Sequence, residues 1–435
     1  MTDAKVMLWE KQIGAVTWLN DRDLGVFQYD PLFVESGIQV SPLMMPLRLA
    51  PYEFPALPRV TFKGLPGMLA DSLPDKFGNA IIDAWLASEG KNKGQFNSVE
   101  RLCYTGSRGM GALEFKPAIR ITRSSSNEIE VAKLVELANK VLAQREGLAG
   151  IFSGEDDRES LNDILRVGTS AGGARAKAIL AWNPKTGEFR SGQIKAPNGY
   201  EYWIIKFDGV NRNRDKEFIA DPQGYGKIEY AYSLMAAAVG IKMSRCRLYG
   251  EGGRNHFMTK RFDREDDGSK IHMQTLCALA HVDFNEAGLF SYEEALQVMK
   301  RLNLPKEDLE QQVLRAIFNV VGRNQDDHVK NISFLMDQAG EWRLSPAYDV
   351  TYSYTPEGRW TSQHQMSING KRDRFTKEDL FSLARAADLK SARAKEMLAR
   401  VIEVVKNWPD YADEAGVDSD QMLGVQASQV VNLLD

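Results

Sequence analysis

One acidic stretch of this sequence carries the residues best suited to chemistry. Residues 322–332 read GRNQDDHVKNI and lie between the end of a predicted helix and a predicted strand. In it Asp326 precedes Asn331 by five positions. Phosphoryl-transfer enzymes use this spacing so that one loop offers a carboxylate to the attacking hydroxyl and an amide oxygen to Mg²⁺. We therefore expect Asp326 to be the base and Asn331 a metal ligand; Asp327 is a competing base, and both aspartates could instead cap a turn.

A second acidic residue, Asp349, follows a predicted hairpin made of ISFLM, the turn DQAG and EWRLSPAY. Protein kinases hold an aspartate after such a hairpin, where it binds Mg²⁺ beneath the ATP phosphates. Asp349 could also cap a helix, but the hairpin before it favours a metal ligand. The sequence thus predicts a Mg²⁺ site made by Asn331 and Asp349.

The phosphates of ATP need a cation, and Lys206 is the best candidate. It lies within the apolar strand WIIKF, where an unpaired ammonium group would be costly. A lysine at a strand edge can also extend its ammonium group into water. On the next predicted helix, Glu229 would orient Lys206, as in the lysine–glutamate pair of kinases, or it would face solvent.

Two further segments and two loop residues complete a predicted nucleotide site. The segment 167–177, VGTSAGGARAK, has a small-residue character, so the backbone around Gly172 and Gly173 could cover phosphates, although no GxxxxGK[ST] motif is present. The segment 259–264, TKRFDR, ends a β-rich region where a kinase hinge would receive adenine. We expect nucleotide contacts from the residues that remain, namely Lys260, Phe262, His328 and Lys330, with His328 as a hydrogen-bonding residue rather than a second base.

The elements that must position these residues change in character along the chain. Residues 1–125 read mainly as strands and turns, with one helix near 76–90. Apolar residues alternate in WEKQIGAVTWL and LGVFQY on either side of the turn NDRD, which predicts a hairpin over residues 9–29. Residues 126–265 read as a β-rich nucleotide lobe, and periodic helices dominate 266–435. Ser291 followed by Glu294 is a capping box that begins one of these helices, and Thr376 with Asp379 begins another. We expect an α+β, bilobal, protein-kinase-like fold with β-rich N-terminal subdomains, an all-helical C-terminal lobe, and ATP between the last two parts.

The composition of the chain excludes several classes of protein but does not indicate which reaction it catalyses. The 435 residues are 43% hydrophobic and 26% charged, with a net charge of −4, which argues against a chain whose main work is to neutralise many phosphates. Three scattered cysteines and five histidines without HExxH spacing argue against a dedicated zinc enzyme. No apolar run is long enough to span a membrane, and the expected location is cytoplasmic.

The order of these motifs resembles the HipA-type bacterial toxin kinases over nearly the whole chain. The matching segments occur in the family's order: LPD at 73–75, SRGMGA at 107–112, SAGGARAK at 170–177, IIK at 204–206, KRFDR at 260–264, QDDHVKN at 325–331 and PAYD at 346–349. The sequence departs from family patterns at Gln325, which replaces Thr, at Asp327, which stands where some members have Gly, and at Lys260, which replaces Glu. A hinge contact at Lys260 would therefore run through the backbone.

The resemblance implies a serine/threonine protein kinase that acts as the toxin of a type II toxin–antitoxin pair. It implies ATP and Mg²⁺ as cofactors, an aminoacyl-tRNA synthetase as the class of protein substrate, and a HipB-like helix-turn-helix antitoxin through which DNA would mainly be contacted. It also implies inactivating autophosphorylation of Ser170, which expels the phosphate-binding loop. Two alternatives stay open: a phosphatidylinositol-kinase-like lipid or small-molecule kinase, because Asp-x-His-x-x-Asn-Ile is similar to that loop too, and a kinase-like module that only binds its partner.

Overall fold

The computed structural model describes residues 2–91, 94, 96–119, 129–143, 164–165, 167–168, 175–210 and 224–434. The chain divides into two compact units. Unit 1 comprises Met1–Gln223, Tyr249–Gln274 and Met336–Gly340, and unit 2 comprises Gly224–Leu248, Thr275–Leu335 and Glu341–Asp435. We expected three parts, at 1–125, 126–265 and 266–435. That division stays a prediction, because the two units each combine segments from different parts of the chain.

The first sheet of unit 1 has the strand order β3-β2-β1-β4. Its strands are β1 (Thr2–Leu8), β2 (Lys11–Leu19), β3 (Leu24–Tyr29) and β4 (Leu113–Lys116). β2 and β3 form an antiparallel hairpin in which Val16 is opposite Phe27, both fully buried. Alternating apolar residues predicted this hairpin, because one face of an antiparallel sheet is buried and the other is not.

Residues 1–125 contain more helix than we expected. The structure has α1 (Pro31–Val34), α2 (Arg59–Phe62), α3 (Gly67–Ala70), α4 (Lys76–Ser88) and α5 (Ser98–Thr105), of which only α4 was predicted. The first three are single turns that begin at or just after a proline, so they are too short to show helical periodicity. α5 did carry a signal, since Asn97 and Glu100 form a capping box at its start.

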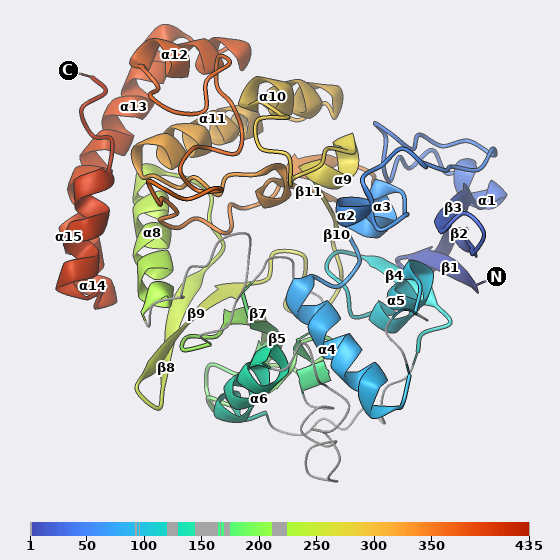
Figure 1. The fold of residues 1–435 in the computed structure, drawn as a ribbon. Coiled ribbons are helices and arrows are strands. Elements are labelled where there is room, and N and C mark those ends of the chain that lie inside the picture. The colour runs from blue at the N-terminus through green and yellow to red at the C-terminus, as the bar shows by residue number, and fades with distance from the viewer. Residues whose placement is uncertain are drawn as a thin grey trace. The chain divides into compact units, whose positions relative to one another are not determined.

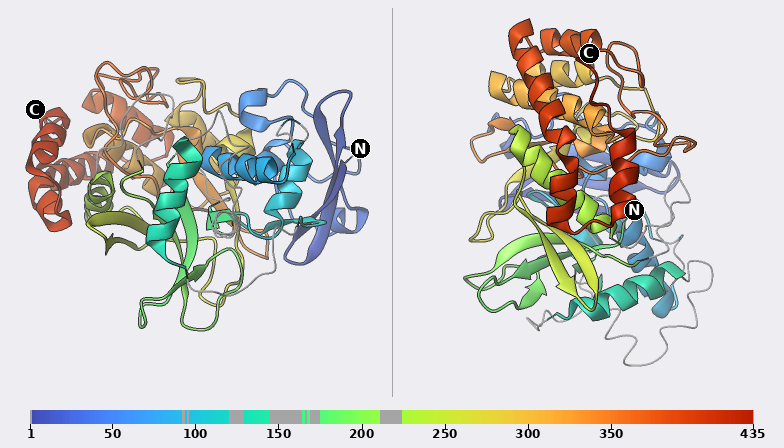
Figure 2. Two further views of the ribbon diagram at one scale, coloured as in Figure 1. Left: turned by 60° about the horizontal axis from the view of Figure 1, so that its bottom comes forward. Right: turned by 90° about the vertical axis from the view of Figure 1, so that its left-hand side faces the viewer.

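The second sheet lies in unit 1 except for residues 246–248 of its edge strand, and it has the order β6-β5-β7-β9-β8. Its strands are β5 (Lys177–Trp182), β6 (Phe189–Ser191), β7 (Glu201–Lys206), β8 (Cys246–Glu251) and β9 (Arg254–Lys260). Trp203 and Ile205 of β7 share a buried core with Phe77 of α4 and Val135 of α6 (Val131–Ala143). Figures 1 and 2 show α4 and α6 side by side near this sheet. The helices therefore cover the sheet that carries Lys206.

Unit 2 is mostly helical. Its helices are α8 (Tyr225–Val239), α9 (Leu276–Ala280), α10 (Tyr292–Arg301), α11 (Lys306–Val321), α12 (Lys377–Ala386), α13 (Ser391–Lys406), α14 (Trp408–Ala415) and α15 (Ser419–Ser428). α11 packs against α10, α12 and α13, while α8 packs against α13 and α14. The capping boxes predicted at Ser291 and Thr376 are present at the starts of α10 and α12.

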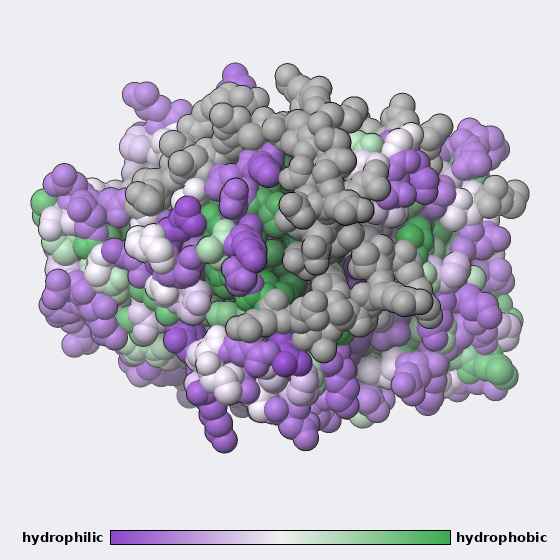
Figure 3. All heavy atoms as spheres, turned by 90° about the horizontal axis from the view of Figure 1, so that it is seen from below, coloured by the Kyte–Doolittle hydropathy of each residue, from purple (hydrophilic) through white to green (hydrophobic). Residues whose placement is uncertain are grey.

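The C-terminal part is not entirely helical, which corrects one expectation. It contains β10 (His272–Thr275) and the hairpin of β11 (Ser333–Met336) and β12 (Trp342–Leu344). The hairpin is the one that the sequence predicts before Asp349. Within the ranges described above, no helix combines the length and apolar character that crossing a lipid bilayer requires. On the face drawn in Figure 3, protruding side chains are mostly hydrophilic, and hydrophobic ones come into view mainly in recessed parts.

Candidate functional site

The acidic loop connects the end of α11 to β11 in unit 2. It begins at Gly322, the C-cap of α11, whose carbonyl accepts a 2.6 Å hydrogen bond from the buried Tyr232 hydroxyl. It ends in a 3-10 turn over Val329–Asn331, directly before β11. Rigid elements thus fix both ends of the loop, as a catalytic constellation requires.

Asp326 lies at the exposed side of this loop, with 41% of its side chain exposed. Its Oδ1 accepts a 2.5 Å hydrogen bond from Trp360 Nε1, and His328 Nε2 is 3.8 Å from the same oxygen. Asn331 folds back across the loop, because its Nδ2 donates to the Asp326 backbone carbonyl at 2.8 Å. That bond directs the amide nitrogen into the loop and leaves Oδ1 as the atom of Asn331 that suits a hard cation.

Asp327 is in a different environment, with only 4% of the residue exposed. Its carboxylate accepts hydrogen bonds from the Tyr292 hydroxyl at 2.7 Å, the Gln365 backbone N–H at 2.7 Å and His364 Nδ1 at 2.8 Å. Burial alone would raise the pKa of Asp327, but the interaction with His364 and the other donors outweighs it and lowers the pKa. The Asp327 carboxylate is therefore used in hydrogen bonds that stabilise the loop. Asp326 is the better candidate for the base.

Asp349 is brought close to the loop by the residue before it. The Tyr348 hydroxyl contacts Ser333 Oγ and donates to the Lys330 carbonyl at 2.7 Å. Asp349 itself is half-buried and has a φ of +52°, a left-handed conformation that costs a non-glycine residue energy. Such strain is concentrated at functional sites.

One pocket of unit 2 is lined by several of the residues that the sequence singled out in this part of the chain, with Asp327 rather than Asp326 among them. Its lining includes His328, Asn331 and Asp349. Carboxylate and amide oxygens are the donors that Mg²⁺ prefers, so the residues present fit this ion. Arg315 also lines the pocket, and burial lowers its pKa to about 10. Arg315 and Trp360 were not predicted, because neither lies in a local motif, and the PAYD segment that contains Tyr348 gave no role to its hydroxyl.

The remaining predicted residues lie in both units. Lys206, on β7 of unit 1, is half-buried, with Nζ 5.7 Å from the centre of the Phe257 ring. Glu229, on α8 of unit 2, is only 1% exposed, so the solvent-facing alternative was wrong. Ser170, Gly172 and Gly173 lie outside the described residues.

The segment 260–264 combines two half-buried residues, Lys260 and Phe262, with three buried charged ones. Lys260 is half-buried, and its Nζ is 2.7 Å from Asp266 and 3.9 Å from Glu201. Phe262 is half-buried between the buried Arg261 and Asp263. Lys260 and Phe262 therefore remain the candidates for a nucleotide contact. Their neighbours Arg261, Asp263 and Arg264 have a different role, because they are paired with one another.

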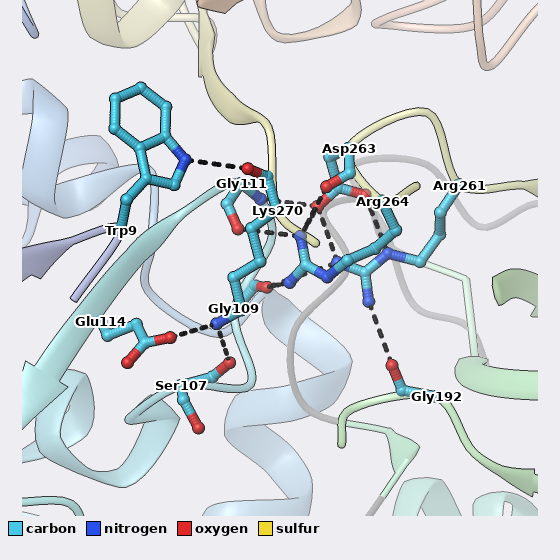
Figure 4. Close-up of polar contacts among 10 residues, drawn as sticks. All are labelled: Trp9, Ser107, Gly109, Gly111, Glu114, Gly192, Arg261, Asp263, Arg264 and Lys270. Atoms are coloured by element: carbon cyan, nitrogen blue, oxygen red, sulfur yellow. Dashed lines mark hydrogen bonds and ion pairs between the residues drawn. The ribbon is translucent and has the colours of Figure 1, made fainter. Parts of the chain in front are cut away.

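Those neighbours form a buried charge network within unit 1, drawn in Figure 4. Asp263 accepts hydrogen bonds from Arg261 at 2.7 and 2.8 Å, from Arg264 at 2.8 Å and from the Gly111 N–H at 2.7 Å. Arg264 in turn donates to the carbonyls of Gly109 and Gly111, both at 2.9 Å. Burial would raise the pKa of Asp263, but the two guanidinium groups outweigh it and lower the pKa strongly.

This network joins two motifs that are far apart in the sequence. The backbone at Gly111 has a φ of +72°, and a Cβ there would lie 3.0 Å from the Met273 backbone nitrogen. The SRGMGA segment therefore needs glycine at this position, because its backbone closely approaches the strand that follows KRFDR. The SRGMGA and KRFDR segments, which the family also contains, therefore stabilise the fold of this unit by binding each other.

The chain is similar to known proteins both in sequence and in fold. Residues 169–408 match the family model of the HipA-like C-terminal domain, and residues 4–116 match that of the HipA N-terminal domain. "Putative kinase Y4mE" of Sinorhizobium fredii (strain NBRC 101917 / NGR234) is 28% identical over 207 residues, which is 42% of this chain and 48% of that protein. The match thus spans about half the length of this curated relative.

A solved structure covers almost the whole chain. It is a chain of the Shewanella oneidensis MR-1 toxin–antitoxin complex of HipA, HipB and operator DNA, with a TM-score of 0.67 and 18% identity. The alignment covers 98% of this chain and 95% of that one. At this identity the likeness concerns the fold, and it confirms the mixed α and β architecture expected from the sequence.

Proposed function

The chain belongs to the HipA family, whose C-terminal domain model matches more than half of it, and on this basis we propose that it is an ATP- and Mg²⁺-dependent serine/threonine protein kinase. The observation that carries the proposal is the arrangement of one loop and one hairpin end in unit 2. There Asp326 is exposed to solvent, and Asn331 and Asp349 line one pocket.

The roles follow from the chemistry of these side chains. Asp326 accepts or orients the proton of the acceptor hydroxyl. Asn331 and Asp349 would hold Mg²⁺, which neutralises phosphate charge when bound. Lys206 is the proposed phosphate ligand, with His328, Lys330, Lys260 and Phe262 as further nucleotide contacts, and catalysis is mainly positioning and electrostatic stabilisation.

We further propose that the chain is the toxin of a type II toxin–antitoxin pair. The similar Shewanella oneidensis fold was solved with HipB and operator DNA, which supports a HipB-like helix-turn-helix partner. A net charge of −4 favours DNA contact mainly through that partner rather than through this chain. An aminoacyl-tRNA synthetase as substrate and autophosphorylation of Ser170 belong to the same proposal.

The test is a phosphoryl-transfer assay with γ-labelled ATP, Mg²⁺ and a cell lysate, followed by separation of protein from lipid. The proposal expects label on protein serine or threonine, including the chain itself. Label on lipid or on a small molecule would instead support the phosphatidylinositol-kinase-like alternative. ATP binding without any transfer would support a kinase-like module that only binds its partner.

A further inference from the structure

An irregular segment of unit 2 brings an aromatic side chain onto the proposed base. Trp360 lies 34 residues after Asp326, and its Nε1 donates to Asp326 Oδ1 at 2.5 Å. The indole is half-buried and lies near the His328 imidazole, with 6.4 Å between ring centres. We propose that Trp360 is a positioning residue that fixes the orientation of the Asp326 carboxylate; this inference rests on the proposed kinase function.

The segment that carries Trp360 is held from one side by Asp327. The Asp327 carboxylate accepts from the Gln365 backbone N–H at 2.7 Å and from His364 Nδ1 at 2.8 Å. The Gln365 side chain then donates to the Trp360 carbonyl at 2.5 Å. Asp327 thereby fixes the backbone on which the indole sits.

Gln325 holds the same segment from the other side. In the amide orientation that satisfies its neighbours, its nitrogen donates to the Thr361 carbonyl at 2.8 Å and its oxygen accepts from Arg323 Nη1 at 2.9 Å. The Gln325 backbone carbonyl also accepts from Gln365 Nε2 at 3.1 Å. Gln325 and Asp327, the two neighbours of Asp326, thus both bind the segment 360–365. The Trp360 indole of that segment binds Asp326 itself.

This arrangement has a definite chemical consequence. A half-exposed aspartate can rotate about two side-chain bonds, and most of its orientations do not suit proton transfer. An indole N–H on Oδ1 fixes that oxygen and, with it, the direction of Oδ2. Because the donor sits on a segment anchored by buried partners, the orientation is set before an acceptor hydroxyl arrives. Trp360 acts through Asp326 and is not itself a catalytic residue.

The decisive variant is Trp360→Phe, which keeps an aromatic ring and loses the N–H. We expect kcat for phosphoryl transfer to fall roughly 10-fold, with KM for ATP unchanged, because misorientation of a reacting group affects the chemical step. The matched control is Trp9→Phe in unit 1, a half-buried tryptophan that loses an indole bond of 2.8 Å to the Lys270 carbonyl. The control should keep the wild-type kcat when both variants are measured well below their unfolding temperatures.

A second measurement does not depend on activity. In ¹⁵N-labelled protein, the indole N–H resonance that disappears in Trp360→Phe should shift in Asp326→Asn, because its acceptor loses its charge. An unshifted resonance, an unchanged kcat in Trp360→Phe, or a higher kcat that shows the indole obstructing the base would each overturn the inference alone. Absence of transfer by the wild-type chain would overturn the proposed function and this inference with it.

Discussion

Asp326→Asn is expected to lower kcat for phosphoryl transfer by about 10²–10⁴-fold, the contribution typical of a general base. The amide keeps the shape of the side chain but cannot accept the proton of the acceptor hydroxyl. ATP binding should be nearly unchanged, because the Mg²⁺ and phosphate contacts that we propose come from other residues. Single-turnover transfer and nucleotide titration, measured on the same protein, separate the two effects.

The matched control for this variant is Asp388→Asn in the same unit. Asp388 has a side chain that is 75% exposed, and it pairs with Lys300 at 2.6 Å. Its loss should leave kcat at the wild-type value, since exposed ion pairs contribute little. If Asp326→Asn phosphorylates protein at the wild-type rate, Asp326 is not the base.

Asp263→Asn is expected to destabilise unit 1 by about 3–5 kcal/mol, the cost of breaking a buried ion pair by removing one partner. The change leaves Arg261 and Arg264, with 0% and 5% of their side chains exposed, without the carboxylate between them. It also weakens the bond to the Gly111 N–H, so the glycine segment should loosen together with the end of the sheet. Unfolding in denaturant measures the loss of stability. Hydrogen exchange of the backbone amides at Gly109 and Gly111 measures the loosening of the glycine segment.

Asp266→Asn is the control, because Asp266 lies only three residues further along and pairs with Lys260 at 2.7 Å, but its side chain is 75% exposed. Its loss should cost at most about 1 kcal/mol, the range of surface ion pairs. Equal effects of the two substitutions would show that the buried network does not stabilise the unit more than an ordinary surface pair.

Features that depend on near neighbours in the sequence were predictable. The capping boxes at Ser291 and Thr376 need only a residue three positions on, and the hairpin of β2 and β3 needs only alternation and a turn. The grouping of Asn331 with Asp349 was also predictable, because a single hairpin separates them and brings the two ends of that hairpin together.

Features that depend on distant segments were not predictable. Asp263 and Gly111 are 152 residues apart. The sequence around KRFDR does not indicate that its charged side chains are buried or that Arg264 binds the carbonyls of Gly109 and Gly111. Trp360 belongs to a segment without regular secondary structure, so neither periodicity nor a motif placed it on Asp326. The same limit applies to Asp327, whose burial favours Asp326 over it as the proposed base and depends on Tyr292 and His364.

The most direct measurement is a crystal structure of the full chain with Mg²⁺ and a non-hydrolysable ATP analogue. We predict a metal ion ligated by Asn331 Oδ1 and an Asp349 carboxylate oxygen at about 2.0–2.1 Å, with the γ-phosphate facing Asp326. A nucleotide and metal bound elsewhere, with Asn331 and Asp349 making no contact to either, would contradict the assignment of this loop as the phosphoryl-transfer site.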